Sequence, residues 1–221
     1  MGEFIYRNND FQDWISLIFF VNLICIYGMF LLDPLRLKRL IRFYATDLYV
    51  SKHISEKNLN YLSPFNLLSF LIILNTLSLL FLSISNYLDV FVEFAFEFYY
   101  ILLNLIIFFS LRFYLLKFIF KQLNLDRDLN IFFFKSFAYN TQFSLIILVF
   151  LFCNFYSSSL NSQFIRVLIF PLGLWFLYQS KIIISLFRSN PRDVLYIILY
   201  LCTLKIIPWY WFYFFAIESK L

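Results

Sequence analysis

The chain has 221 residues, of which 62% are hydrophobic and 24% aromatic but only 14% charged, and its mean hydropathy is +0.79. An ordinary soluble domain has about 25% charged residues, so this composition excludes a soluble globular protein. A net charge of +5 is compatible with a nucleic-acid partner. Because the basic residues flank apolar stretches, membrane lipids are the expected partner instead, and no nucleic acid.

Apolar stretches recur along the chain at a length close to the ~20 residues that a membrane-spanning helix needs. We predict an all-α integral membrane protein, a bundle of six transmembrane helices, that forms one polytopic domain over residues 1–221. The predicted spans are residues 14–32, 64–85, 90–111, 141–156, 164–187 and 194–217.

Two of these spans have unusual flanks. The third has no clear break before Asn124, so its helix is expected to project past the bilayer and carry Arg112, Lys117 and Lys121. Residues Ile131 to Tyr139 are Phe-rich and interrupted by Lys135, which favours an interfacial piece that leads into the fourth span.

Basic residues fall almost entirely into every second gap between the spans. They follow the first, third and fifth spans, whereas the gaps after the second and fourth carry none. Because short loops rich in Lys and Arg stay in the cytoplasm, this alternation predicts basic cytoplasmic loops and extracytoplasmic N- and C-termini.

The segment after the first span, which begins at Leu35 and ends at Phe43, is basic and amphipathic. Such a helix lies in the interfacial plane and attracts anionic lipid headgroups. The headgroup-binding residues of this segment would be Arg36, Lys38, Arg39 and Arg42. A lipid-handling membrane protein is therefore one alternative function.

Among the ionisable residues within predicted spans, where a charge costs about 2.5–3.5 kcal/mol at the centre on insertion scales, four stand out. They are Glu93, Glu97, Arg166 and Lys205. Three interpretations stay open: mutual neutralisation that fixes helix register, a proton or substrate pathway, and a counter-charge supplied by a partner's helix.

The third span also carries Tyr100 and Asn104, at helical spacing from Glu97. Positions three and four residues apart share one face of a helix. We therefore expect a polar stripe that points into the bundle.

Catalytic constellations are missing from the sequence. His53 is the only histidine and lies in a polar loop, and no span contains a His or paired aspartates for intramembrane proteolysis. The cysteines have no metal-ligand spacing. We therefore predict no enzyme, no catalytic residue, no metal and no cofactor.

Three sequence features occur together in one known family. They are Asp13-Trp14 at the first span, the basic segment Asp33-Pro-Leu-Arg-Leu-Lys-Arg39, and the last-span motif Tyr196-Ile-Ile-Leu-Tyr-Leu-Cys-Thr-Leu-Lys-Ile-Ile-Pro208. In these the chain resembles a Bacteroidota family of small polytopic inner-membrane proteins of unknown function, although Lys205 stands where the motif has an acidic residue. The resemblance implies the inner membrane of a Gram-negative bacterium, and no assigned activity.

The favoured function is a non-enzymatic accessory or scaffold subunit of a larger membrane or envelope complex, such as a secretion or biogenesis machine. Its partners would be other membrane-protein subunits or further copies of the chain, with Trp175 and Trp209 as exposed contacts. The alternative is a small-molecule or ion-coupled transporter or channel that uses the four intramembrane charges.

The predicted orientation can be tested by labelling single cysteines from outside the cell. A cysteine placed at Ser158 should react with an impermeant thiol reagent, and one placed at Ser55 should react only after the membrane is permeabilised. The opposite pattern would reverse the orientation.

Overall fold

The computed structural model describes residues 13–42, 63–87, 94–122, 126–156 and 164–189, and all the regular structure in these ranges is α-helical. The helices are α1 (Asp13–Leu32), α2 (Pro34–Ile41), α4 (Pro64–Tyr87), α5 (Phe94–Gln122), α6 (Asp126–Tyr156) and α7 (Phe164–Ser189). The predicted sixth span, residues 194–217, lies outside the described residues.

Four of these helices are long and apolar enough to cross a membrane. The qualifying segments are Trp14–Leu32, Pro64–Ile84, Phe98–Leu115 and Ile131–Tyr156. For the described residues this confirms the all-α prediction with four spanning candidates, and it indicates a multi-pass membrane protein. The predicted fifth span is also helical, as α7.

Two helices are longer than the spans predicted for them. α5 continues to Gln122, so the expected extension of the third helix is present. α6 begins at Asp126, so Ile131 to Tyr139 continue the fourth span and form no separate piece. Neither Pro nor Gly occurs between Asp126 and Tyr156, and the partly exposed Lys135 does not interrupt the backbone hydrogen bonds.

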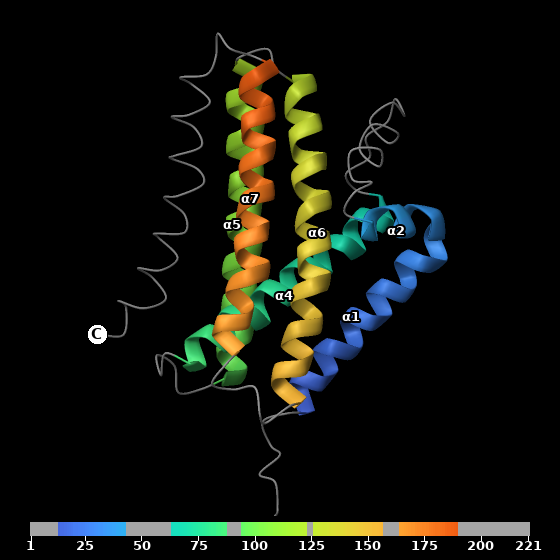
Figure 1. Ribbon diagram of the computed structural model, residues 1–221, viewed down its shortest axis with the longest axis vertical. Helices are drawn as coiled ribbons and strands as arrows, with labels where there is room; N and C mark the ends of the chain where they lie inside the picture. The colour runs from blue at the N-terminus through green and yellow to red at the C-terminus, as the bar shows by residue number, and fades with distance from the viewer. Residues whose placement is uncertain (1–12, 43–62, 88–93, 123–125, 157–163, 190–221) are drawn as a thin grey trace, which may run out of the picture.

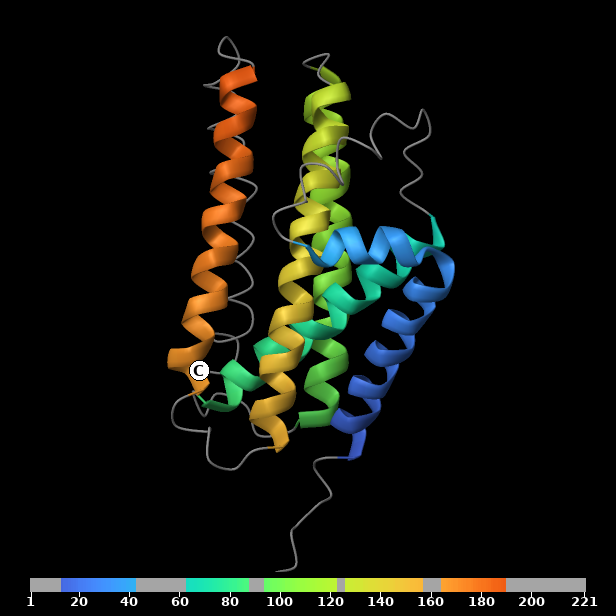
Figure 2. The same cartoon turned by 45° about the vertical axis from the view of Figure 1, so that its right-hand side comes forward.

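Consecutive long helices run in opposite directions (Figure 1). α5, α6 and α7 stand roughly upright, while α1 and α4 are inclined and α2 lies across the upper part of α1 and α4 (Figures 1 and 2). Because of this alternation, α2 and the C-terminal ends of α5 and α7 lie toward the same end of the bundle. We call it the basic end, after the four Lys and Arg residues of α2 and its C-cap.

α4 is the central helix and packs against α1, α5 and α6. Its buried Leu74, Leu79 and Leu82 form one core cluster with residues of α1, α5 and α6. The first turns of α4 join a second cluster, in which Phe65 and Ile72 meet Met29 of α1 and Leu40 of α2. Burial of these side chains makes α4 the element that connects the others.

A buried amide pair also joins α1 to α4. Asn75 Nδ2 donates to Asn22 Oδ1 over 3.2 Å, and Asn22 is fully buried. Apolar contacts give little net drive for association between helices in lipid, so interhelical hydrogen bonds and close packing carry more of the task. The Asn22–Asn75 pair therefore fixes the register of α1 on α4.

The amphipathic segment predicted after the first span is the helix α2. The side chain of Asp33 caps it by accepting from the backbone N–H of Arg36 over 2.8 Å, and Pro34 occupies the first turn, where no N–H is needed. Leu37 and Leu40 are buried against the bundle, while Lys38 is exposed.

Gly28 lies in close contact with α4. A Cβ atom added at Gly28 would lie 3.0 Å from Leu68 Cδ1, whereas a Cβ at Gly173 of α7 would meet nothing within 4 Å. A larger side chain at Gly28 would therefore have to displace the Leu68 side chain, whereas one at Gly173 would meet no such neighbour.

We predict that Gly28→Leu destabilises the protein by about 1–3 kcal/mol, the usual range for overpacking. Gly173→Leu is the matched control and should leave stability unchanged or raise it by up to about 1 kcal/mol, because leucine favours a helix more than glycine does. Thermal unfolding in detergent micelles measures both. Equal effects of the two changes would contradict a close α1–α4 contact at Gly28.

Candidate functional site

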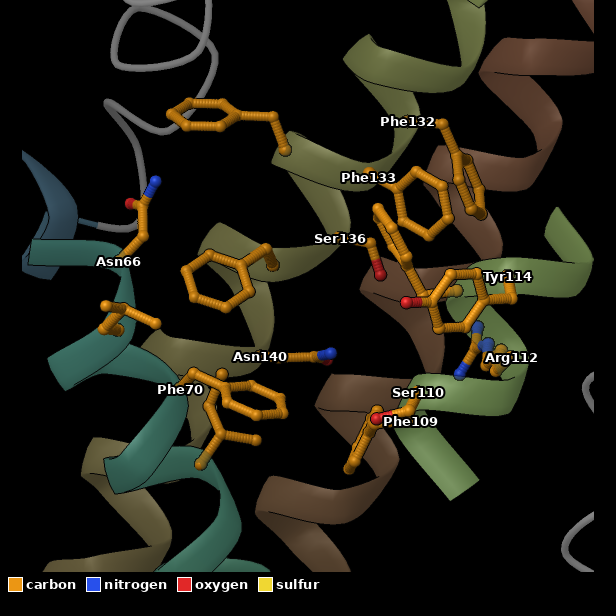
Figure 3. Close-up of a pocket in the computed structure, with 15 residues that line it drawn as sticks. Asn66, Phe70, Phe109, Ser110, Arg112, Tyr114, Phe132, Phe133, Ser136 and Asn140 are labelled. Atoms are coloured by element: carbon orange, nitrogen blue, oxygen red, sulfur yellow. The ribbon is translucent and has the colours of Figure 1, made fainter. Parts of the chain in front are cut away.

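A pocket of about 390 Å³ lies between α4, α5 and α6. We call it the aromatic pocket, because most of its lining consists of rings (Figure 3). The aromatic lining residues are Phe70, Phe109, Phe113, Tyr114, Phe132, Phe133, Phe134 and Phe137. The polar lining residues are Asn66, Ser110, Arg112, Ser136 and Asn140.

The pocket forms because α4 and α5 diverge toward the basic end. On α5, Phe98, Ile101 and Leu105 are buried in the core cluster. One turn further on, Phe109 still touches α4 through an edge contact with Phe70, with ring centroids 6.0 Å apart. Beyond it, the inclination of α4 leaves space on the inner side of α5.

α6 closes the other side of this space. Phe132 and Phe134 are buried, and Phe133 contacts Phe113 of α5 with ring centroids 5.2 Å apart. The opposite side is more open, since Tyr114 is 71% exposed and Leu67 46% exposed. The pocket therefore has a closed wall of rings and an open mouth between α4 and α5.

Polar groups join α6 to α7 beside the pocket. Asn140 Oδ1 accepts two hydrogen bonds, from Trp175 Nε1 over 2.9 Å and from Gln179 Nε2 over 2.8 Å. Ser136 Oγ donates to Gln179 Oε1 over 3.3 Å. We call these four residues the α6–α7 polar cluster.

This cluster fixes which way the Asn140 amide faces. Both neighbours on α7 donate, so the oxygen must point toward them. The NH₂ group of Asn140, which lines the pocket, is therefore directed to its interior (Figure 3). The pocket gains a hydrogen-bond donor whose orientation is set by α7.

The basic segment of α2 is tied to the edge of the pocket. Arg36 Nη2 donates to Asn66 Oδ1 over 2.8 Å, and the Arg36 guanidinium carbon lies 4.2 Å from the centroid of the Phe65 ring. Gln142 of α6 donates to the backbone oxygen of Leu40. Arg36 thus contacts the bundle, whereas Lys38 and Arg42 are exposed and Arg39 is partly buried.

The predicted intramembrane charges are divided between described helices and residues outside the described ranges. Glu93 and Lys205 lie outside the described residues. Glu97 and Arg166 lie in α5 and α7, but their side chains are not described. Pairing among these four residues stays a prediction.

Tyr100 and Asn104 of the predicted polar stripe do not point into the described bundle. Tyr100 is 55% exposed, and Asn104 is partly buried. Asn104 Nδ2 donates to the backbone oxygen of Tyr100 in the same helix, over 2.9 Å. They lie away from the inner face of α5, because α4 covers the side that carries Ile101 and Leu105.

Sequence reasoning did not find the α6–α7 polar cluster. Trp175 was expected as an exposed contact, but it is partly buried and donates to Asn140. The available signal was a pair of polar residues four apart on each of two consecutive spans, Ser136 with Asn140 and Trp175 with Gln179. Such pairs lie one turn apart on one helix face.

The described residues contain no group of three or more His, Cys, Asp or Glu that could hold a metal ion. The aromatic pocket offers neither a nucleophile paired with a base nor a carboxylate pair in its lining. Its chemistry is that of a binding site with apolar walls and a few donors.

The model of one protein family, a domain of unknown function (DUF4271), matches residues 15–216. The chain belongs to the DUF4271 family. This confirms the expectation of a family of unknown function over nearly the whole chain, and the DUF4271 match includes the aromatic pocket and the α6–α7 polar cluster. No curated protein and no solved structure matches the chain.

We predict that Asn140 and Trp175 are energetically coupled. A double-mutant cycle of Asn140→Leu and Trp175→Phe should give a coupling energy of about 0.6 kcal/mol, and at most about 1.7 kcal/mol, the range measured for interhelical hydrogen bonds in membranes. Unfolding in detergent micelles gives the free energies of the four proteins.

Asn104→Leu, paired with the same Trp175→Phe, is the control for this cycle. Asn104 bonds within its own helix, so its coupling to Trp175 should be zero within error. Equal coupling in both cycles would contradict the hydrogen bond between α6 and α7.

Proposed function

We propose that this protein is a non-enzymatic accessory or scaffold subunit of a larger membrane complex, such as a secretion or biogenesis machine. It would lie in the inner membrane of a Gram-negative bacterium of the Bacteroidota, with both termini outside the cytoplasm and the basic end inside. Its partners would be other membrane-protein subunits, with lipid around the rest of the bundle.

The supporting observation is the outer face of α5, which no other described helix covers. Only 17% of its span is buried, against 33–56% in the other three. Large side chains recur along this face at intervals of three and four residues, and each is more than half exposed. We call them the α5 ridge, and they are Tyr100, Leu103, Ile107 and Leu111.

A polar group beside this ridge argues against simple contact with lipid. Asn104 lies roughly 9 Å into the span, at ~1.5 Å per residue from Phe98. Its amide oxygen has no hydrogen-bond partner among the described residues. Lipid tails offer no donor to such a group, so a further helix is expected to cover this face. We assign that helix to a partner protein.

The cores of the described helices favour a fixed structure over a moving one. Hydrogen bonds between side chains join α1 to α4, α2 to α4, and α6 to α7. A bundle whose helices are joined by hydrogen bonds, with the α5 ridge exposed on its surface, suits a subunit that holds a partner in place.

The test is a photo-reactive amino acid at Ile107, activated in native membranes that contain the full chain. We expect a crosslink to a second, different polypeptide, which mass spectrometry then identifies. The matched control is the same residue at Leu105, which is 2% exposed on the inner face of α5 and should crosslink only within the chain.

Three results would contradict the proposal. A crosslink from Ile107 only to residues 194–217 would mean that the chain covers its own ridge, which favours the transporter interpretation of Glu93, Glu97, Arg166 and Lys205. A crosslink to lipid alone would remove the need for a partner. A crosslink to a second copy alone would indicate a homo-oligomer and no larger complex.

A further inference from the structure

We propose that the aromatic pocket binds an anionic phospholipid, with one acyl chain among the rings and the phosphate beside Arg112. This site is separate from the α5 ridge, and its occupation does not depend on a partner subunit. The argument combines the walls of the pocket, its donors and its place in the bundle.

The walls suit a hydrocarbon chain. The closed side consists of buried rings of α6, including Phe132 and Phe134, and of Ile73 from α4. A volume of about 390 Å³ falls at the lower end of the ~300–1,000 Å³ typical of ligand pockets. It accommodates part of one lipid, so the second chain would lie along the outside of the bundle.

The mouth lies where a lipid would enter. It opens between α4 and α5, two helices of spanning length, beside the exposed Leu67 and Tyr114. A chain can therefore pass sideways from the bilayer into the pocket without crossing water.

The polar lining supplies donors for an anion. Arg112 carries a permanent positive charge, and the α6–α7 polar cluster holds the Asn140 amide so that its NH₂ group faces the pocket. None of the lining residues is acidic. Phosphate and ester oxygens accept hydrogen bonds, so an anionic glycerophospholipid complements this set in both charge and hydrogen bonding.

The pocket also lies at the depth of a lipid headgroup. It is lined by the first turns of α4, from Asn66 to Ile73, and Asn66 bonds to Arg36 of the amphipathic helix α2. Helices of this kind lie at the boundary of headgroups and acyl chains. The exposed Lys117, five residues beyond Arg112 on α5, adds positive charge toward the same basic end of the bundle. The bound lipid would come from the leaflet at the basic end.

The first experiment is native mass spectrometry of the full-length protein, titrated in detergent with phosphatidylglycerol or phosphatidylcholine. We expect one phosphatidylglycerol to bind more tightly than phosphatidylcholine. Arg112→Gln should weaken phosphatidylglycerol binding about fivefold, the factor that corresponds to the ~1 kcal/mol typical of one basic residue at an anionic surface. Lys117→Gln makes the same charge change outside the lining and should have less than half of this effect.

A second pair of variants tests the chain-binding part. Ser110 lines the pocket and is exposed, so Ser110→Trp should fill the mouth without disturbing the core and should abolish binding of both lipids. Ile107→Trp places the same ring on the α5 ridge and should leave lipid binding unchanged. Thermal unfolding of each variant shows that loss of binding is not loss of folding.

The outcomes separate the possible ligands. Equal affinity for the two lipids, or equal effects of Arg112→Gln and Lys117→Gln, would overturn the assignment of the phosphate to Arg112. Displacement of the lipid by glycerol phosphate at equal concentration would show a site for the free phosphate and overturn the acyl-chain assignment. Unchanged binding in Ser110→Trp would place the lipid elsewhere on the protein.

Discussion

The inclination of α4 is the constraint on which the rest of the bundle depends. α4 is the most buried of the spanning candidates, with 56% of its span enclosed, and α1, α5 and α6 all pack on it. Because it crosses α5 at an incline, the two helices touch at one end and separate at the other. The buried core and the aromatic pocket are thus two results of a single crossing.

Side-chain hydrogen bonds set the positions that apolar packing leaves free. Contacts between Phe, Leu and Ile side chains of neighbouring helices differ little in energy from contacts with lipid, so apolar packing alone does not fix how one helix is positioned along another. Asn22 with Asn75, and Asn140 with Gln179, each accept only one arrangement. These few pairs define how the helices lie, although they form a small part of the contact area.

The sequence predicted that the helices are present, but it predicted poorly which face of each helix is buried. The span predicted to begin at residue 64 matches the start of α4 at Pro64, and the amphipathic segment predicted from Leu35 to Phe43 falls close to α2 (Pro34–Ile41). The separate interfacial piece expected at Ile131 to Tyr139 did not occur, since one lysine among phenylalanines does not disrupt a helix and these residues lie within α6. Helix starts depend on local chemistry, which a single sequence contains.

Which face turns inward depends on the neighbouring helices and not on local chemistry. In a chain that is apolar all round, periodicity gives little information about the inner side of a helix. Polar residues of α5 were therefore expected inside, and Tyr100 is exposed. The polar residues that do pair, Asn140 and Gln179, are uncharged and resemble many other Asn and Gln in the sequence. Their role in joining the helices becomes visible only in the structure, where α6 and α7 lie side by side.

The polar cluster between α6 and α7 has a consequence for how the chain enters the membrane. Asn140, Ser136 and Gln179 would each be poorly solvated if their helices entered the bilayer one at a time. The two helices are consecutive in the chain, and the hydrogen bonds between them need no other part of the protein. α6 and α7 can therefore insert together as a helical hairpin in which Ser136, Asn140 and Gln179 already hydrogen-bond to one another.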